Sequence, residues 1–248
     1  MGVAELVGRM VGVLVAPLVF LVALVRGARA FHPDGGVFRA EVRATAVDAP
    51  LVAVAERLAG PALARLSAAM VRGEVEKPDV LGLGLRFGAA GTQDLLLATF
   101  DGFGPRQLRA AMATTDVHDF LHNDYRAVSP FRVDGLGLVT LHARGDGAAG
   151  GDGAAGDDGV SRGERLAEAM AAGRARLRVE ARPLPPDGDG APRPLVDLVL
   201  VGRASVPPAS LRLSPFRDGL GLRPVGFLAG IRWVVYPVSQ LARRLRHG

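Results

Sequence analysis

Apolar and polar residues alternate in several stretches of the chain, and this alternation is typical of strands that bury one face. The segment FRAEVRATAV at residues 38–47 shows it most clearly. Short apolar runs predict further strands at residues 79–87, 93–100, 135–145, 174–184 and 194–205. Helices are expected over 51–58, over most of 105–127 and at both ends of the chain. Antiparallel strands framed by terminal helices predict an α+β fold, built on an antiparallel β-barrel or a strongly curved sheet.

Two glycine-rich features interrupt this pattern. Gly82 and Gly84 lie inside the predicted strand 79–87, where glycine is unfavourable, so they predict a bulge or the close approach of a flat group. The tract GDGAAGGDGAAGDDG at 145–159 has no means of packing, and we predict a flexible loop over residues 145–160. Its aspartates lack the regular spacing of a calcium-binding loop, so no metal is expected there.

An uncharged run, MVGVLVAPLVFLVALV, covers residues 10–25 between Arg9 and Arg26. It is shorter than the roughly 18 to 20 residues of a membrane-spanning helix, and Pro17 interrupts it. The small residues ARA at 28–30 follow it, as in a secretion signal. A secretion signal, a membrane-surface anchor and a buried N-terminal helix are the three interpretations.

Composition limits the chemistry that the chain can perform. With 248 residues, 49% hydrophobic and 22% charged, the chain is long and apolar enough for one globular domain. It has no cysteine, which excludes disulfides, thiolate metal sites and cysteine nucleophiles. The net charge of +5 comes almost wholly from arginine, which pairs well with carboxylates and phosphates. No aromatic platform accompanies the arginines, so nucleic acid is not an expected partner.

The last apolar segment contains one of the two tyrosines of the chain. If residues 231–246 form a helix, Arg232, Tyr236 and Arg243 lie on one stripe, away from the apolar face. A guanidinium stabilises the phenolate form of a neighbouring tyrosine, and a phenolate is a suitable ligand for ferric iron. The alternative is that Tyr236 and Trp233 anchor a basic amphipathic helix to a membrane surface.

Five segments of the chain together resemble the haem catalases, and they occur in the order found in that family. They are RAFHPDGGVF at 29–38, ARLSAAM at 64–70, PDVLGLGLRF at 78–87, GTQDLLLATF at 91–100 and RWVVYPVSQLAR at 232–243. The resemblance covers roughly residues 26–246. It implies a catalase-type β-barrel without the extended N-terminal arm, the wrapping segment or the C-terminal helical domain of full-length catalases.

The resemblance also implies a site for ferric haem b. Tyr236 would be the proximal iron ligand, with Arg232 as its charge partner. His32 would be the distal acid and base, and Ser67 would hydrogen-bond its other ring nitrogen. Three arginines match those that hold the haem propionates in the family: Arg29, Arg65 and Arg243.

The chain departs from the family at the distal asparagine, which Ala98 replaces. Thr99 is the candidate substitute donor. The loss of the asparagine suggests a haem-dependent peroxidase with weak catalase activity that prefers organic or lipid hydroperoxides to hydrogen peroxide. The alternative function is a non-catalytic haem- or lipid-binding protein at a membrane surface. Outside the resemblance, His32 in its HPDG sequence is equally typical of a surface turn, and His118 and His122 are interpreted as a solvated helix face.

Cleavage after Ala30 would remove Arg29, which the resemblance needs. We therefore predict an uncleaved apolar helix at 1–28, serving as anchor or buried helix, and a single haem-binding domain at 29–248. The expected location is the cytoplasm, either free or peripheral at the inner membrane face. The expected partners are a hydroperoxide, an unidentified electron donor and a membrane surface, and a homo-oligomer is left open.

Overall fold

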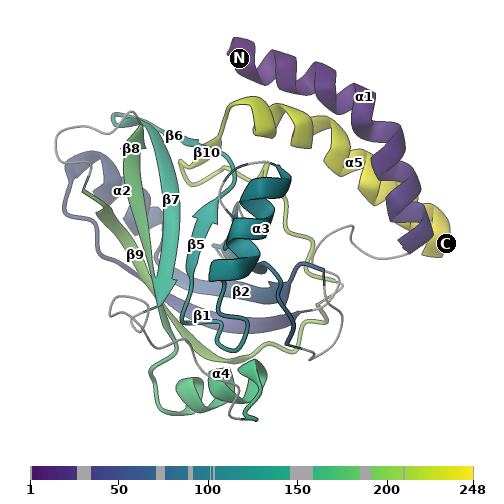
Figure 1. Ribbon diagram of the computed structural model, residues 1–248. Coiled ribbons are helices and arrows are strands. Elements are labelled where there is room, and N and C mark those ends of the chain that lie inside the picture. Colours follow the sequence, from purple (N-terminus) through teal and green to yellow (C-terminus); the bar gives the residue numbers. More distant parts are fainter. Residues whose placement is uncertain are drawn as a thin grey trace.

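The computed structural model describes residues 2–26, 35–70, 76–88, 92–100, 102, 104–145, 159–184, 191–208 and 210–247. Its centre is a closed antiparallel β-barrel (Figure 1). The sheet order is β7-β5-β4-β3-β2-β1-β9-β8, and pairing of β8 with β7 closes the barrel. These strands are β1 (Gly36–Ala44), β2 (Gly60–Ala68), β3 (Leu81–Phe87), β4 (Gln93–Ala98), β5 (Asp124–Ala127), β7 (Gly137–Gly145), β8 (Arg176–Leu184) and β9 (Arg193–Arg203). Two short strands, β6 (Phe131–Val133) and β10 (Arg223–Pro224), extend the sheet beside β7.

The barrel is filled by side chains rather than hollow. Leu66, Leu83 and Leu97 lie opposite one another across β2, β3 and β4, and all three are at most 3% exposed. Tyr125 on β5 is completely buried in the same core, and its hydroxyl donates to the carbonyl of Phe120 at 2.8 Å. Burial raises the pKa of this phenol, so Tyr125 stays neutral and is a structural residue. The predicted α+β barrel is therefore confirmed.

The prediction of a helix over most of 105–127 is wrong after residue 114. Helix α3 (Pro105–Thr114) ends there, and β5 follows after a series of bends. Side chains in this segment bond to nearby backbone: Asp116 accepts from the N–H of His118 at 2.9 Å, and the Asn123 amide donates to the carbonyl of Asp116 at 2.9 Å. Such local bonds compete with helix formation and explain the difference.

Two smaller helices pack near the barrel, and one of them was not anticipated. Helix α2 (Ala49–Leu58) matches the predicted helix at 51–58. Helix α4 (Arg162–Ala171) begins at a capping box, in which Ser161 and Glu164 bond to each other's backbone N–H. The strands β2, β5 and β6 were also not anticipated. Most of the predicted loop at 145–160 lies outside the described residues.

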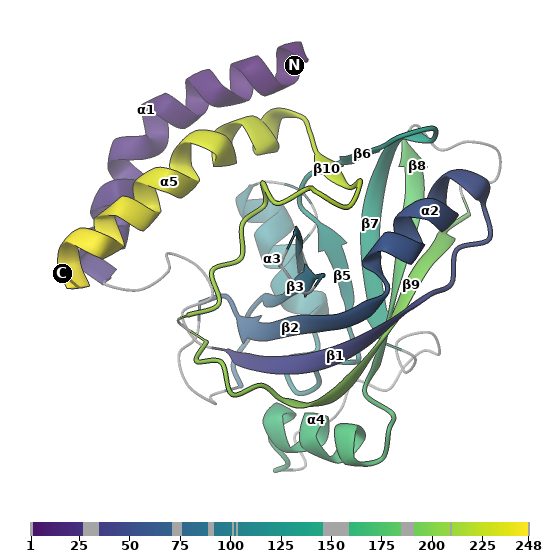
Figure 2. The ribbon, with the colours of Figure 1, turned by 180° about the vertical axis from the view of Figure 1, so that it is seen from behind.

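Two long helices lie outside the barrel. Helices α1 (Val3–Arg26) and α5 (Phe227–His247) run side by side in the same direction, and α5 lies between α1 and the barrel (Figures 1 and 2). Pro17 lies within α1 and Pro237 within α5, so neither proline ends its helix. Among the described residues, no helix combines the length and the apolar character that a membrane crossing requires.

Candidate functional site

The outer face of β2, β3 and β4 brings together several of the predicted site residues. Arg65 on β2 lies opposite Gly84 on β3, and Ser67 lies opposite Gly82. Directly opposed residues share one face of a sheet, and neighbours along a strand point to opposite faces. Because Leu66 points into the barrel core, Arg65 and Ser67 lie on the outer face. They are nevertheless only 5% and 3% exposed, so other parts of the chain cover this face.

Arg65 and Ser67 interact directly. The Nη1 of Arg65 donates to the Oγ of Ser67 at 3.3 Å, and this Oγ lies 3.5 Å from the carbonyl oxygen of Gly82. Gly35 lies against the same place: a Cβ there would overlap the carbonyl oxygen of Leu66 and would lie 2.7 Å from Ser67 Cβ. Gly35, the first described residue after residues 27–34, therefore lies beside Ser67. Arg29 and His32 belong to that segment and lie outside the described residues.

Thr99, the candidate distal donor, is part of a hydrogen-bonded chain. Its Oγ1 accepts from the N–H of Leu81 at 3.1 Å and lies 2.7 Å from the Oγ1 of Thr115. Thr115 in turn donates to the carbonyl of Ala111 at 2.7 Å. A hydroxyl has one proton, so Thr99 is the donor to Thr115. In this arrangement the hydroxyl proton of Thr99 forms a hydrogen bond that connects the end of β4 to the end of α3. It is therefore not available to a substrate.

Ala98, which stands where the family has asparagine, lies in the same row as Ser67 and Gly82. It packs in a small apolar cluster whose members include Val80 and Ala111 of α3. Helix α3 therefore covers this end of the outer face.

On α5, Arg232 and Tyr236 lie one turn apart and interact electrostatically. Burial lowers the pKa of the Arg232 guanidinium, and its interaction with Tyr236 acts in the opposite direction. The Tyr236 hydroxyl donates to the carbonyl of Leu213 at 3.3 Å, and its ring meets the Phe216 ring edge to face at 6.4 Å. Tyr236 thus faces the barrel side of α5. The side chain of Arg243 lies outside the described residues.

Residues 210–217, here called the covering segment, lie between Tyr236 and the sheet. The Asp94 carboxylate fixes this segment by accepting from the N–H of Ser214 at 2.7 Å. Leu213 is 7% exposed and sits directly on Gly84, so that a Cβ on Gly84 would overlap Leu213 Cδ1. The close approach predicted at Gly84 is therefore present, but the approaching group is a leucine side chain. No periodic pattern marked the covering segment in the sequence.

The described side chains are of types that could hold a haem, but the structure leaves no space for the macrocycle between them. A phenol beside a guanidinium suits ferric iron, and a buried arginine suits a propionate. Leu213, however, occupies the space between Tyr236 and Gly84. A flat macrocycle enters between α5 and the sheet only if both the side chain and the carbonyl group of Leu213 move.

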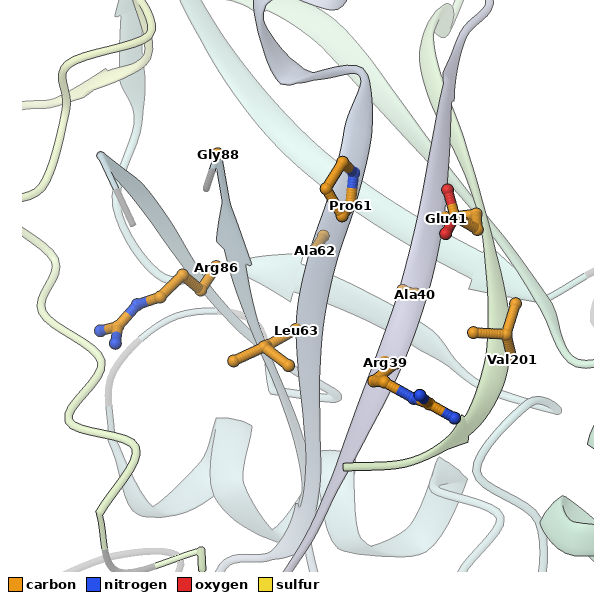
Figure 3. A pocket seen from close by; sticks show the side chains of 9 residues that line it. All are labelled: Arg39, Ala40, Glu41, Pro61, Ala62, Leu63, Arg86, Gly88 and Val201. Carbon is orange, nitrogen blue, oxygen red and sulfur yellow. The ribbon is translucent and has the colours of Figure 1, made fainter. Parts of the chain in front are cut away.

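A separate hollow of about 470 Å³ lies on the outer surface of β1, β2 and β3, beyond the covering segment. Figure 3 shows Arg39, Leu63 and Arg86 around it. Arg86 forms a two-pronged ion pair with Asp94 at 2.8 and 2.9 Å, so its charge is compensated. The lining residues are Arg39, Ala40, Glu41, Pro61, Ala62, Leu63, Arg86, Gly88 and Val201. Tyr236 and Ser67 do not line this hollow.

Three histidines of the described chain, His118, His122 and His142, lie beside carboxylates. His118 contacts Glu76, and His122 Nδ1 lies 3.0 Å from Asp116, so the interpretation of these residues as a solvated helix face is wrong. His142 and Arg144 flank Asp124 on the neighbouring strand, at 3.4 and 3.1 Å. Within the described part of the chain, no group of three or more histidines and acidic residues is arranged to hold a metal ion.

Comparisons with known proteins support the fold. No protein-family model and no curated protein matches the sequence. Among solved structures, a fungal catalase superimposes with a TM-score of 0.60 and 11% identity, covering 88% of this chain and 60% of that chain. Catalase A from Saccharomyces cerevisiae gives a TM-score of 0.60 and 9% identity, covering 87% of this chain and 60% of that chain.

These similarities define the class of fold. The chain has a catalase-type β-barrel and spans about 60% of the length of the catalases it matches. Identity near 10% is a likeness of fold, and a shared fold does not by itself transfer an activity.

Proposed function

We propose that this protein is a haem-dependent peroxidase that reduces hydroperoxides. One observation carries the proposal: in a catalase-type barrel, Tyr236 and Arg232 on α5 face the sheet surface that holds Arg65 and Ser67, with Leu213 between them. A phenol and an arginine on one side, and a buried arginine and a serine on the other, match the two sides of a haem site. The catalase fold of the solved neighbours supports the same class of chemistry.

Each residue has a distinct role in this proposal. Arg232 stabilises the phenolate of Tyr236, which holds the iron, and Arg65 pairs with a propionate, together with Arg29 and Arg243. A ferric haem bound there supplies the redox chemistry that cleaves the peroxide bond. His32 moves a proton between the two oxygens of the hydroperoxide, and Ser67 orients its ring. Two electrons from an unidentified donor, together with two protons from that donor or from solvent, complete the reduction of the hydroperoxide to an alcohol and water.

The distal side favours organic or lipid hydroperoxides over hydrogen peroxide. Ala98 offers no amide, and the proton of Thr99 is donated to Thr115. The two disproportionation steps of a catalase therefore lack a distal hydrogen bond. An oxygen electrode and a cumene hydroperoxide assay compare the two activities, and oxygen evolution at ordinary catalase levels contradicts this preference.

Haem binding through Tyr236 is tested by absorption spectroscopy. The protein is purified, incubated with hemin and examined for the spectrum of tyrosinate-ligated ferric haem. Tyr236→Phe is expected to lose this spectrum. Tyr125→Phe, which changes the other tyrosine inside the barrel, is the matched control and is expected to retain it. Failure of the protein to take up haem contradicts the proposal, and an unchanged spectrum in Tyr236→Phe contradicts the ligand assignment.

The second candidate is a non-catalytic haem- or lipid-binding protein. The observation that favours its lipid-binding form is Leu213, which occupies the space that a haem would need between Tyr236 and Gly84. Haem uptake without peroxidase turnover in the experiment above distinguishes this candidate from an enzyme.

A further inference from the structure

Helix α1 is apolar on both of its long faces. One face lies against α5 through Gly8 and Gly12, which are both buried. The opposite face, called the outer face of α1, is made of large apolar side chains that are 45 to 81% exposed. Its residues are Val3, Leu6, Val7, Met10, Val13 and Leu14. Large apolar side chains gathered on one exposed helix face mark an interaction surface, and this face is not covered by the described part of the chain.

The two helices form one tightly packed unit, and we call it the α1–α5 pair. A Cβ on Gly8 would overlap the carbonyl oxygen of Phe227, and a Cβ on Gly230 would overlap that of Glu5. Contacts this close between helix backbones fix the position and rotation of α1 on α5. The outer face therefore cannot turn inward without breaking the pair.

The net positive charge of the protein is concentrated in this pair. Helix α1 contains two arginines and one glutamate, and α5 contains four arginines and no acidic residue. The pair thus carries five net positive charges, which equals the formal net charge of +5 of the entire chain. Everything outside the pair is neutral overall, so an anionic partner is attracted to the same unit that exposes the apolar face.

Trp233, the single tryptophan of the chain, lies on the exposed side of α5. It is 52% exposed, and the guanidinium of Arg9 on α1 stacks over its ring at 4.3 Å. A tryptophan beside an arginine, next to large apolar side chains, is the combination that suits the boundary between lipid headgroups and acyl chains.

We propose that the α1–α5 pair docks this protein on the surface of a bilayer that contains anionic lipids. The outer face of α1 enters the boundary between headgroups and acyl chains, and arginines of the pair other than Arg232, which lies on the barrel side of α5, contact lipid phosphates. Docking lies in the plane of the bilayer, because the exposed apolar side chains follow one face along the axis of α1. The proposal goes beyond the peroxidase and does not depend on haem.

Vesicle binding of the full-length protein tests the proposal. Trp233 is the only tryptophan, so its emission reports on the pair alone. Vesicles of phosphatidylcholine and phosphatidylglycerol are expected to shift this emission to the blue and to carry the protein upward in flotation. Binding to phosphatidylcholine alone is expected to be weaker. Raising the salt from about 0.1 M to about 1 M, which shortens the Debye length from about 10 Å to about 3 Å, is expected to weaken binding to the anionic vesicles.

A double substitution locates the contact on the outer face of α1. Met10→Glu with Leu14→Glu is expected to lower the partition coefficient about tenfold or more, because two charges must then enter the apolar layer. Val47→Glu is the matched control, since Val47 is an equally apolar residue, 82% exposed on the barrel. Circular dichroism verifies that each variant is folded.

Three outcomes would overturn the proposal. One is equal binding of the double variant and the control. Another is the absence of both flotation and a spectral shift with anionic vesicles. The third is a dimer in vesicle-free solution that the double variant abolishes, which would show that a second copy of the chain covers this face. Haem uptake is measured separately, so each of these results leaves the proposed function to its own test.

Discussion

Leu213 is the residue on which the haem hypothesis depends most directly. Its side chain lies on Gly84, and its carbonyl accepts the hydroxyl proton of Tyr236. A macrocycle bound between Tyr236 and Gly84 must therefore displace both this carbonyl and this side chain, and the side chain is the part that a substitution can remove.

Leu213→Ala is therefore expected to raise the affinity for hemin while lowering stability by about 2 to 3 kcal/mol, as for other buried leucines. Leu211→Ala removes a leucine of the same apolar cluster and is the matched control for stability. Hemin titration followed by absorption measures the affinities, and urea unfolding measures the loss of stability. Equal hemin affinity in the two variants would speak against a site between Tyr236 and Gly84.

At the scale of elements, glycines allow the backbones of α1 and α5 to pack closely. Gly8 and Gly12 face Phe227 and Ile231, so the two helix backbones lie almost in contact. In α5 the face toward α1 is opposite the face that carries Tyr236. A substitution at the α1 contact can therefore affect Tyr236 only by moving the whole of helix α5.

Gly8→Leu is expected to separate α1 from α5 and to leave the barrel folded. The new side chain would overlap the Phe227 carbonyl, which is part of the α5 backbone and cannot shift without moving the helix. Hydrogen exchange measured by mass spectrometry is expected to show lost protection in α1 and unchanged protection in β1 to β9. Val7→Leu, at the neighbouring exposed position, is the control and is expected to change neither. Protection of α1 in Gly8→Leu equal to that of the unmodified protein would refute this account of the pairing.

At the scale of the whole molecule, the pairing of β5 with β7 within the barrel places Asp124 opposite Arg144. Burial alone would raise the pKa of Asp124, but hydrogen bonds and charge interactions with His142 and Arg144 outweigh it and hold the pKa well below its ordinary value. A carboxyl with a lowered pKa stabilises the folded state when ionised. This contribution is complete above the ordinary pKa of about 4 and is lost as the pH falls toward the lower pKa of the folded state.

The free energy of unfolding is therefore expected to fall as the pH drops from about 5 to about 3, and to fall less steeply in Asp124→Asn. At neutral pH the substitution is expected to cost about 1 to 3 kcal/mol, as for other hydrogen bonds to charged groups. Urea unfolding across this pH range measures both effects. Parallel pH dependences in the two proteins would exclude Asp124 as a source of acid sensitivity.

The sequence by itself indicated six of the eight barrel strands, all except β2 and β5, because a run or an alternation of apolar residues is a local property of each strand. It also indicated the terminal helices, and it placed Arg232 and Tyr236 on one stripe of the last helix through simple periodicity. The glycine at position 84 correctly predicted a close approach, although the sequence did not indicate which group approaches.

Only the tertiary structure decided how β8 meets β7, that α1 lies along α5, and that Leu213 fills the space over Gly84. These are contacts between residues far apart in the chain, such as Gly8 with Phe227 and Gly84 with Leu213. No periodic pattern records such partners, because each half of the contact satisfies its local structure equally well without the other. The covering segment contains no helix or strand, so its position is set by the residues that it contacts, such as Asp94 and Gly84. That position determines whether Tyr236 faces a ligand or Leu213.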